Sequence, residues 1–301
     1  MRIIDAHHHL WAPDTPALDV GYVWLKDIGA MKPFGDPTPI QRDYLLDEYL
    51  AEPGTQTLAA SVHVQADPRL PDPVAETAFV QHISDTSGHP IMIVGFADLA
   101  GDGLEETLNR HKAHANLRGI RQIISHLPNR PDLSFAATNL LNNPKWCDQF
   151  GVLKDHELSF DLQLYPEQMM QAAAFLAQHP SIPVVIDHLG SPYDPSPAGL
   201  ALWAQGMQAL AALPHVHVKL SGYAMFFGAD LSGPAVEVSQ GILEWFGPER
   251  VMFGSNFPVD KLHLTYGDVV AFVRAQVGTD PAHQAQIFGQ SAAMFYAVSL
   301  T

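Results

Sequence analysis

Eight short apolar runs, each followed by a stretch of helical periodicity, constrain the fold of this chain more than any other feature. The runs are Ile3–Ile4, Thr57–Val64, Ile91–Phe96, Gly119–Ile124, Leu158–Leu164, Val184–Ile186, Val216–Leu220 and Val251–Phe253. In the segments between them, apolar residues recur at intervals of three and four, which is typical of amphipathic helices. These segments are Tyr44–Ala51, Pro73–Thr86, Leu104–Ala113, Pro166–Gln178, Leu200–Leu213, Ala235–Phe246 and Tyr266–Val277.

Strands that alternate with helices indicate an α/β fold with a parallel sheet and right-handed crossovers. Eight such units close into a (β/α)8 TIM barrel, and 301 residues suit one domain of that kind, spanning residues 1–301. An open doubly wound sheet is the alternative, but no G-x-G-x-x-G turn follows the first run. The last segment, Pro281–Val298, is predicted to be a further helix outside the barrel.

Composition excludes several classes of function. Acidic residues number 32 against 16 Lys plus Arg, a formal charge of −16, which disfavours binding to nucleic acid and to anionic membranes. The single cysteine, Cys147, rules out an intrachain disulfide and is expected to be a core residue. The first residues lack the apolar core of a signal peptide, and no apolar run reaches about 18 residues. We therefore expect a cytoplasmic protein with a small-molecule substrate, and homo-oligomerisation stays open.

Two segments are longer than ordinary connections between a strand and a helix. Leu10–Arg42 follows the first run and contains Trp11, Trp24 and Phe34, and Ser125–Leu133 follows the fourth run. Loops of this length in a compact domain are usually functional or disordered. The aromatic content of Leu10–Arg42 favours an ordered lid over the strand ends, with Trp24 as a candidate substrate contact.

Histidines follow the first and sixth runs, where active sites of such barrels lie. Residues two apart in a strand share a face, so His7 and His9 are expected to point together, with Asp5 one step deeper. Two such imidazoles can bind one metal ion, and His188, in the dipeptide Asp187-His188, is a third inward-facing candidate. The alternative is a chance cluster of histidines at a strand end.

Other polar side chains are candidates for binding substrate. Arg121 in the fourth run could bind a carboxylate or a lactone oxygen through two hydrogen bonds, or form a structural ion pair with Asp5 or Asp161. His63 and Gln65 end the second run, and they are either substrate contacts or a hydrogen-bonded pair at the barrel mouth.

The fifth, seventh and eighth runs add a second group of candidates. Gln163 shares a face with Asp161, and Lys219 is either a substrate contact or a buried ion-pair partner. Asn256 follows the eighth run. Because an amide stays uncharged, Asn256 can orient water or substrate but cannot act as a general base.

Taken together, these motifs resemble the amidohydrolase superfamily, and more closely its amidohydrolase-related group of sugar-lactone and pyrone-dicarboxylate lactonases. The segments that carry the resemblance, in order and over nearly the whole chain, are residues 5–11 (DAHHHLW), 62–66 (VHVQA), 119–123 (GIRQI), 160–168 (FDLQLYPEQ), 186–192 (IDHLGSP), 218–222 (VKLSG) and 252–259 (MFGSNFPV). Each motif alone is only modestly specific, whereas seven in register make the resemblance strong.

The resemblance implies a site in which His7, His9 and His188 hold a metal ion or the attacking water, with Arg121, His63 and Gln163 near the substrate. In the family the eighth strand usually ends in an aspartate that activates water, and here that position is Asn256, so the identity of the base stays open. No carboxylated lysine or glutamate of the dinuclear relatives is recognisable, which predicts at most one divalent ion, zinc first. Some relatives hydrolyse lactones without metal, so metal-free operation stays open too.

The function that follows is hydrolysis of a lactone, a sugar-acid lactone by resemblance, as in carbohydrate catabolism. Water at His7, His9 and His188 would attack the carbonyl, the metal, or Arg121 together with His63, would stabilise the oxyanion, and Asn256 would position the water. Two alternatives remain: non-oxidative decarboxylation of an unsaturated or aromatic acid, and ligand binding without catalysis on the same scaffold. Asn256 argues against the first, and the retained histidines with Arg121 argue against the second.

Overall fold

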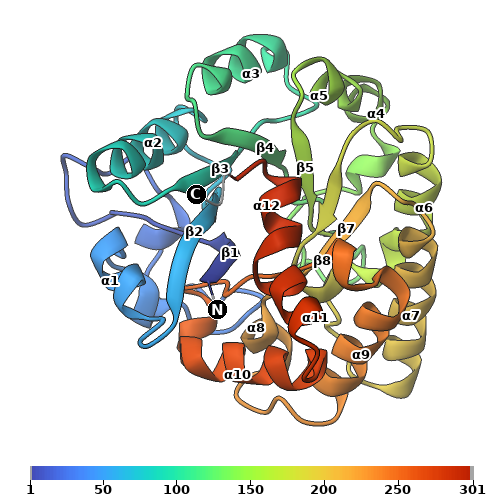
Figure 1. Ribbon diagram of the computed structural model, residues 1–301. Coiled ribbons are helices and arrows are strands. Elements are labelled where there is room, and N and C mark those ends of the chain that lie inside the picture. Colours follow the sequence, from blue (N-terminus) through green and yellow to red (C-terminus); the bar gives the residue numbers. More distant parts are fainter. Residues whose placement is uncertain (1, 299–301) are drawn as a thin grey trace.

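The computed structural model describes residues 2–298, and its strands form one parallel eight-stranded sheet in the order β1 to β8. The sheet curls into a barrel (Figure 1), as the alternating pattern predicts. The strands are β1 (Arg2–His8), β2 (Thr57–Val64), β3 (Ile91–Gly95), β4 (Leu117–Arg121), β5 (Ser159–Leu162), β6 (Val184–Ile186), β7 (Val216–Leu220) and β8 (Val251–Phe253).

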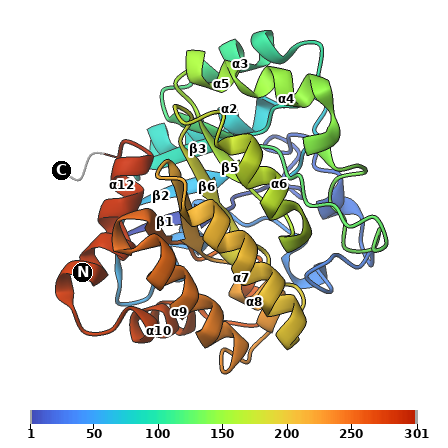
Figure 2. The same ribbon diagram turned by 90° about the vertical axis from the view of Figure 1, so that its right-hand side faces the viewer.

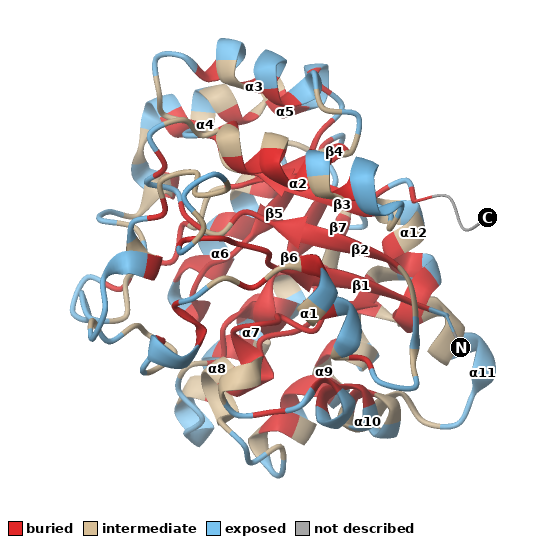
Figure 3. Cartoon of the chain, turned by 90° about the vertical axis from the view of Figure 1, so that its left-hand side faces the viewer, coloured by how far each residue is buried: buried red, intermediate tan, exposed pale blue. Residues whose placement is uncertain are grey.

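Helices surround the barrel and cover the apolar outer faces of its strands. They are α1 (Leu46–Ala51), α2 (Ala75–Ser87), α3 (Leu104–Lys112), α4 (Pro144–Phe150), α5 (Val152–Asp155), α6 (Pro166–Leu176), α7 (Pro197–Ala211), α8 (Tyr223–Phe227), α9 (Pro234–Phe246), α10 (Tyr266–Val277), α11 (Pro281–Ala285) and α12 (Ser291–Phe295). Figure 2 shows α6, α7 and α9 side by side on one flank. The strands are almost entirely buried, and exposed residues lie on the outer faces of the helices (Figure 3).

Several strand bounds differ from the predicted runs, and three further details of the prediction change. The fourth strand begins two residues before the predicted run Gly119–Ile124, so Arg121 ends β4 instead of lying inside it. The connection from β4 to β5 contains the helices α4 and α5, which the periodicity did not separate from the loop. The predicted final helix is interrupted by a π-helical segment, Gln286–Gln290, between α11 and α12.

The C-terminal helices close the end of the barrel opposite the strand C-termini. Figure 1 shows α12 lying across that end. Tyr296, directly after α12, is fully buried, and its hydroxyl donates to the Asp161 carboxylate at 3.0 Å. The barrel lumen therefore has a closed floor, and its open end is the one at the C-terminal ends of the strands.

The barrel closes between β1 and the segment that follows β8, and a buried carboxylate holds the closure. Asp5 in β1 accepts hydrogen bonds from the backbone N–H of Ser255 at 2.8 Å and of His7 at 3.1 Å. Its second oxygen accepts from the hydroxyls of Tyr49 and Tyr266 at 2.8 and 3.3 Å. Four donors from separate parts of the chain thus converge on one side chain.

The long segment after β1 is ordered against the open end of the barrel. The Trp24 indole N–H donates to the carbonyl of Ala66 at 2.9 Å, and the backbone N–H groups of Val23 and Trp24 donate to Asp67 at 2.6 and 3.0 Å. Trp11 and Trp24 meet edge to face, with ring centroids 5.3 Å apart. These contacts form the lid that the aromatic content predicts.

None of the helices formed by residues 2–298 is long and apolar enough to cross a membrane.

The Asp5→Ala substitution should lower the free energy of unfolding by about 3 kcal/mol, because it leaves several buried donors without an acceptor. Denaturant unfolding of the variant and the wild type measures the difference. Asp5→Asn, which keeps one oxygen acceptor, should cost clearly less. Equal losses in the two variants would contradict the role assigned to the carboxylate.

Candidate active site

A cavity of about 670 Å³ opens at the C-terminal ends of the strands. Its polar wall comes from residues at or just beyond the strand ends, namely His9 after β1, Arg121 at the end of β4, Gln163 after β5, His188 after β6 and Asn256 after β8. Trp11, Trp24 and Phe34 of the lid, with Phe135, form an apolar wall. A neighbouring cavity of about 470 Å³ shares Gln163, Phe135 and Met225 with the first.

His7 and His9 share a face of β1, as the alternation predicts, and their ring centroids are 5.1 Å apart. His8 points the other way, where its ring stacks on Tyr49 with centroids 4.0 Å apart. His7 lies below the cavity wall, fully buried, and its ring is 4.3 Å from that of His188. The three histidines predicted to act together therefore lie close to one another.

His188 occupies a strained backbone position. His188, Leu189 and Ser191 all have positive φ, at 50°, 60° and 52°, in the left-handed region that non-glycine residues rarely adopt. A Cβ atom on Gly222 would lie 2.7 Å from the His188 Nδ1 atom, so only glycine fits there. Strain that persists at a polar cavity is typical of functional sites, where the surroundings hold a side chain in one orientation.

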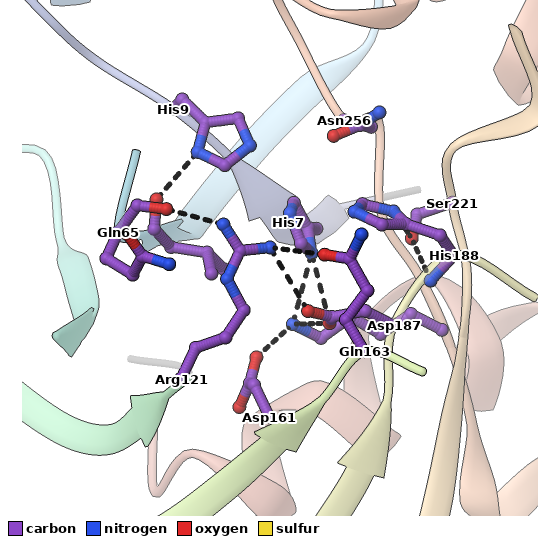
Figure 4. A network of polar contacts seen from close by, with 12 residues as sticks. His7, His9, Gln65, Arg121, Asp161, Gln163, Asp187, His188, Ser221 and Asn256 are labelled. Atoms are coloured by element: carbon purple, nitrogen blue, oxygen red, sulfur yellow. Dashed lines mark hydrogen bonds and ion pairs between the residues drawn. The ribbon is translucent and has the colours of Figure 1, made fainter. Parts of the chain in front are cut away.

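A buried network of alternating charges lies beneath the histidines (Figure 4). Lys219 on β7 pairs with Asp161 at 2.5 Å and with Asp187 at 3.0 Å. The second oxygen of Asp187 is 3.3 Å from the Arg121 guanidinium. Burial alone would raise the pKa of Asp187, but Lys219, His7 and Arg121 together hold it well below its usual value. Asp187 is therefore ionised at neutral pH.

Arg121 is fixed by three different partners. Its guanidinium donates to Asp187 and to the Gln163 side-chain oxygen, both at 3.3 Å, and to the backbone carbonyl of Gln65 at 2.5 Å. The Nε atom is buried and makes no hydrogen bond within residues 2–298. The structural ion pair foreseen for Arg121 thus exists, with Asp187 as the partner instead of Asp5 or Asp161.

The site histidines are neutral. Burial lowers the pKa of His7 and of His9 well below the usual value, and it lowers the pKa of His188 to about 3. The Nδ1 atom of His9 lies 2.6 Å from the Val64 carbonyl, which can only accept, so Nδ1 carries the proton. Its Nε2 atom therefore keeps a free lone pair that can bind a metal or a proton.

A group of side chains fits one divalent metal ion. Within residues 2–298, the ligand atoms of His7, Asp187 and His188 lie within 4.8 Å of one another. The Nε2 atom of His7 is buried and makes no hydrogen bond to any residue that the structure describes. Two neutral imidazoles and a carboxylate suit a divalent ion of the zinc type. His9, which we predicted as the third ligand, adjoins this group but is not one of its three members.

Asn256, three residues beyond the end of β8, lies in the left-handed region of backbone conformation, with φ of 56°. Its backbone N–H donates to the carbonyl of His7 at 2.7 Å, and its side-chain Nδ2 atom donates to Asp260 at 2.9 Å. Its side chain lines the cavity, where it faces the histidines (Figure 4).

The remaining predicted residues occupy three places. Trp24 and Gln163 line the cavity. Lys219 lies in the ion network below it. His63 is fully buried behind the wall, where it accepts from the Leu10 N–H at 3.1 Å and lies 3.4 Å from Glu76, and the Gln65 side chain is buried without a hydrogen-bond partner within residues 2–298.

Sequence reasoning missed four supporting residues. Ser221 lies 3.1 Å from the His188 Nδ1 atom, and Asp260 binds Asn256. Glu76 contacts His63, and Tyr296 binds Asp161. Ser221 follows β7 directly, two residues after Lys219, and its pairing with His188 could have been inferred because β6 and β7 are adjacent. The other three lie on helices or loops, where no strand periodicity marks them.

An eight-stranded barrel whose histidines, aspartate and arginine converge at the C-terminal strand ends has the architecture of a barrel enzyme. The chain belongs to the amidohydrolase family, whose family model matches residues 4–298.

Several known proteins resemble the whole chain. The protein y4mH of Sinorhizobium fredii is 34% identical over 99% of both chains. An L-fucono-1,5-lactonase of Burkholderia multivorans is 29% identical over 98% of this chain and 96% of its own length. A solved amidohydrolase from Burkholderia multivorans with bound zinc has a TM-score of 0.79 and 27% identity, covering 99% of this chain and 100% of its own.

We expect His8→Phe to raise the free energy of unfolding, and to do so more strongly in acid. Both His8 ring nitrogens are buried without a hydrogen bond to residues 2–298, so phenylalanine should gain about 1 kcal/mol at neutral pH. Burial holds the pKa of His8 well below 6.5, so below about pH 6.5 only the unfolded chain takes up this proton and stability falls. At about pH 5.5 the gain should therefore grow by a further ~1.4 kcal/mol.

Denaturant unfolding at the two pH values measures this dependence. The exposed Met294 provides the control, because Met294→Ala removes no titratable group and should leave the pH dependence unchanged. An equal gain from His8→Phe at both pH values would contradict a neutral, buried His8.

Proposed function

We propose that this protein is a lactonase that opens a sugar-acid lactone or a similar cyclic ester with water. The observation that carries the proposal is the pairing of neutral imidazoles, His9 and His188, with the Arg121 cation on the wall of one cavity. Relatives that span the whole chain and are named L-fucono-1,5-lactonase support it. An L-rhamnono-gamma-lactonase that matches about half of the chain adds to this support.

Arg121 would bind the lactone carbonyl oxygen. The negative charge that develops on that oxygen meets a cation that is only 4% exposed, and hydrogen bonds to Asp187, Gln163 and the Gln65 carbonyl already hold the guanidinium in place. Fixed donors aimed at a developing oxyanion stabilise the transition state more than the ground state. The apolar lid wall, Trp11 and Trp24, would pack against the carbon face of the ring.

A neutral imidazole would act as the base. His188 lines the cavity and stays unprotonated above about pH 4, because its pKa is about 3. Water transfers a proton to the imidazole as its oxygen bonds to the carbonyl carbon, the ring C–O bond then breaks, and the same proton passes to the leaving alkoxide. The product is the open-chain hydroxy acid.

A divalent ion held by His7, Asp187 and His188, with His9 adjacent, would act as a Lewis acid on the carbonyl. We propose zinc, which also occurs in a related solved structure. Arg121, Asn256 and the lid would bind and orient the substrate in the same way with or without the ion. If His188 holds the ion, His9, with its free Nε2 lone pair, is the imidazole left to accept the proton.

We expect purified protein to hydrolyse one or more of a panel of sugar 1,4- and 1,5-lactones, followed by proton release. His188→Ala should lower kcat/KM by about 1000-fold or more while the circular dichroism spectrum and Tm stay close to wild type. His283→Ala, at an exposed position, is the matched control and should behave as wild type. Wild-type rates in His188→Ala would overturn the site assignment.

The same panel separates the alternatives. Release of CO2 from an unsaturated or aromatic acid, with no ring-opened acid from any lactone, would favour decarboxylation. Saturable binding of a lactone without turnover would favour a binding protein.

Elemental analysis of the protein as purified should find about one zinc per chain, and removal by a chelator should lower lactone hydrolysis. His7→Ala should lose both the metal and the chelator sensitivity. Metal-free protein with undiminished hydrolysis would contradict the metal site and leave Arg121 and the histidines as the direct acid, base and oxyanion groups.

A further inference from the structure

Asp260 is a buried carboxylate with no role in the mechanism above. It lies fully buried at the start of a short 3-10 helix, Asp260–Leu262, four residues after Asn256. No lysine, arginine or histidine within residues 2–298 forms an ion pair with it. Its side chain accepts hydrogen bonds from the Asn256 Nδ2 atom at 2.9 Å and from the Ala224 backbone N–H at 3.2 Å, and the Tyr223 backbone N–H is a further donor.

Those contacts determine which end of the Asn256 amide faces the cavity. An ionised Asp260 carboxylate can only accept hydrogen bonds, and its two oxygens lie 2.9 Å from the Asn256 side-chain amide and 3.2 Å from the Ala224 backbone N–H. Asn256 must therefore turn its NH2 group toward Asp260, and its carbonyl oxygen is left on the other side. Figure 4 shows that oxygen end on the side of His9.

The Asn256 amide therefore presents its oxygen, a hydrogen-bond acceptor, to the cavity. Its NH2 group, a donor, has nearly the same shape and would fit in the same place. An amide oxygen accepts a hydrogen from water, whereas an amide NH2 would direct the lone pairs of that water toward Asn256 and away from the lactone carbon. Burial raises the pKa of Asp260 to about 7, and the contacts fit its ionised form.

We propose that Asp260 is a positioning residue that fixes the amide of Asn256 with its oxygen toward the cavity, where it orients the attacking water. This inference rests on the proposed hydrolytic function. Asn256 cannot act as a base, so it can only orient the water through a hydrogen bond. Asp260 determines which end of the Asn256 amide makes that hydrogen bond.

Substitutions that change which of the two side chains, Asn256 or Asp260, donates the hydrogen bond between them test the proposal. They are measured at about pH 8, where most of the Asp260 carboxyl is ionised. In Asp260→Asn, the backbone N–H of Ala224 still needs an acceptor, so the new amide turns its NH2 toward Asn256. Asn256 must then flip and present NH2 to the cavity. We expect kcat/KM to fall about ten-fold or more while Tm is not lowered, because every buried hydrogen bond is kept.

The double variant Asn256→Asp with Asp260→Asn restores an acceptor on the cavity side. It should recover kcat/KM to within about three-fold of wild type. The single variant Asn256→Asp places two carboxylates face to face and should lower Tm. Full activity in Asp260→Asn, or no recovery in the double variant, would overturn the proposal, and so would parallel losses of activity and Tm in Asp260→Asn.

An NMR measurement separates a failure of this inference from a failure of the proposed function. In protein labelled with ¹⁵N at asparagine, the signal that Asn256→Asp removes belongs to the Asn256 side-chain NH2. It should exchange slowly with solvent in the wild type and faster in Asp260→Asn, with the exposed Asn109 as reference. Exchange in the wild type as fast as at Asn109 would overturn the inference, whether or not any lactone is hydrolysed.

Discussion

Two carboxylates and two cations alternate through the lumen of the barrel, and the site above depends on their balance. Asp161, Lys219, Asp187 and Arg121 form a chain of ion pairs in which no charge stands alone. Buried ions are costly unless each has a partner, so the loss of one member would leave an uncompensated charge. These ion pairs also hold site residues in place, because Asp187 lies 3.3 Å from the Nδ1 atom of His7 and from the guanidinium of Arg121.

The space above this network is shaped by backbone positions that accept few residues. His188 and Asn256 both have positive φ, and both line the cavity. A Cβ atom on Gly254 would lie 2.8 Å from the Cβ atom of His7, so only glycine fits at position 254. Strain at the two strand ends is balanced by the hydrogen bonds of Ser221 to His188 and of Asn256 to Asp260. The histidines, the arginine and the amide are thus held before a substrate arrives.

The fold could be predicted from the sequence because its periodicity is strong, and the bounds of Thr57–Val64, Val184–Ile186 and Val216–Leu220 agree with the strands to the residue. The shared face of His7 and His9 could be predicted for the same reason, since alternation along a strand fixes direction.

Contacts between elements could not be predicted in this way. Whether Lys219 meets substrate or Asp161 depends on the curvature of the barrel, and the place of His63 depends on Glu76 from α2. The contact between Asp260 and Asn256 could not be predicted, because no strand or helix periodicity relates these two positions. Sequence patterns predict on which face of a strand or helix a side chain lies. Which side chains come into contact depends on how these elements pack together.

We propose that the carbonyl of a lactone binds between Arg121 and His188. The crystal structure of a complex with a lactam analogue, in which N–H replaces the ring oxygen, tests it most directly. We expect the ring in the cavity of about 670 Å³, with the carbonyl oxygen within hydrogen-bonding distance of Arg121 and the carbonyl carbon next to His188. A ring bound in the neighbouring cavity beside Tyr165 and Tyr193, away from both residues, would contradict it.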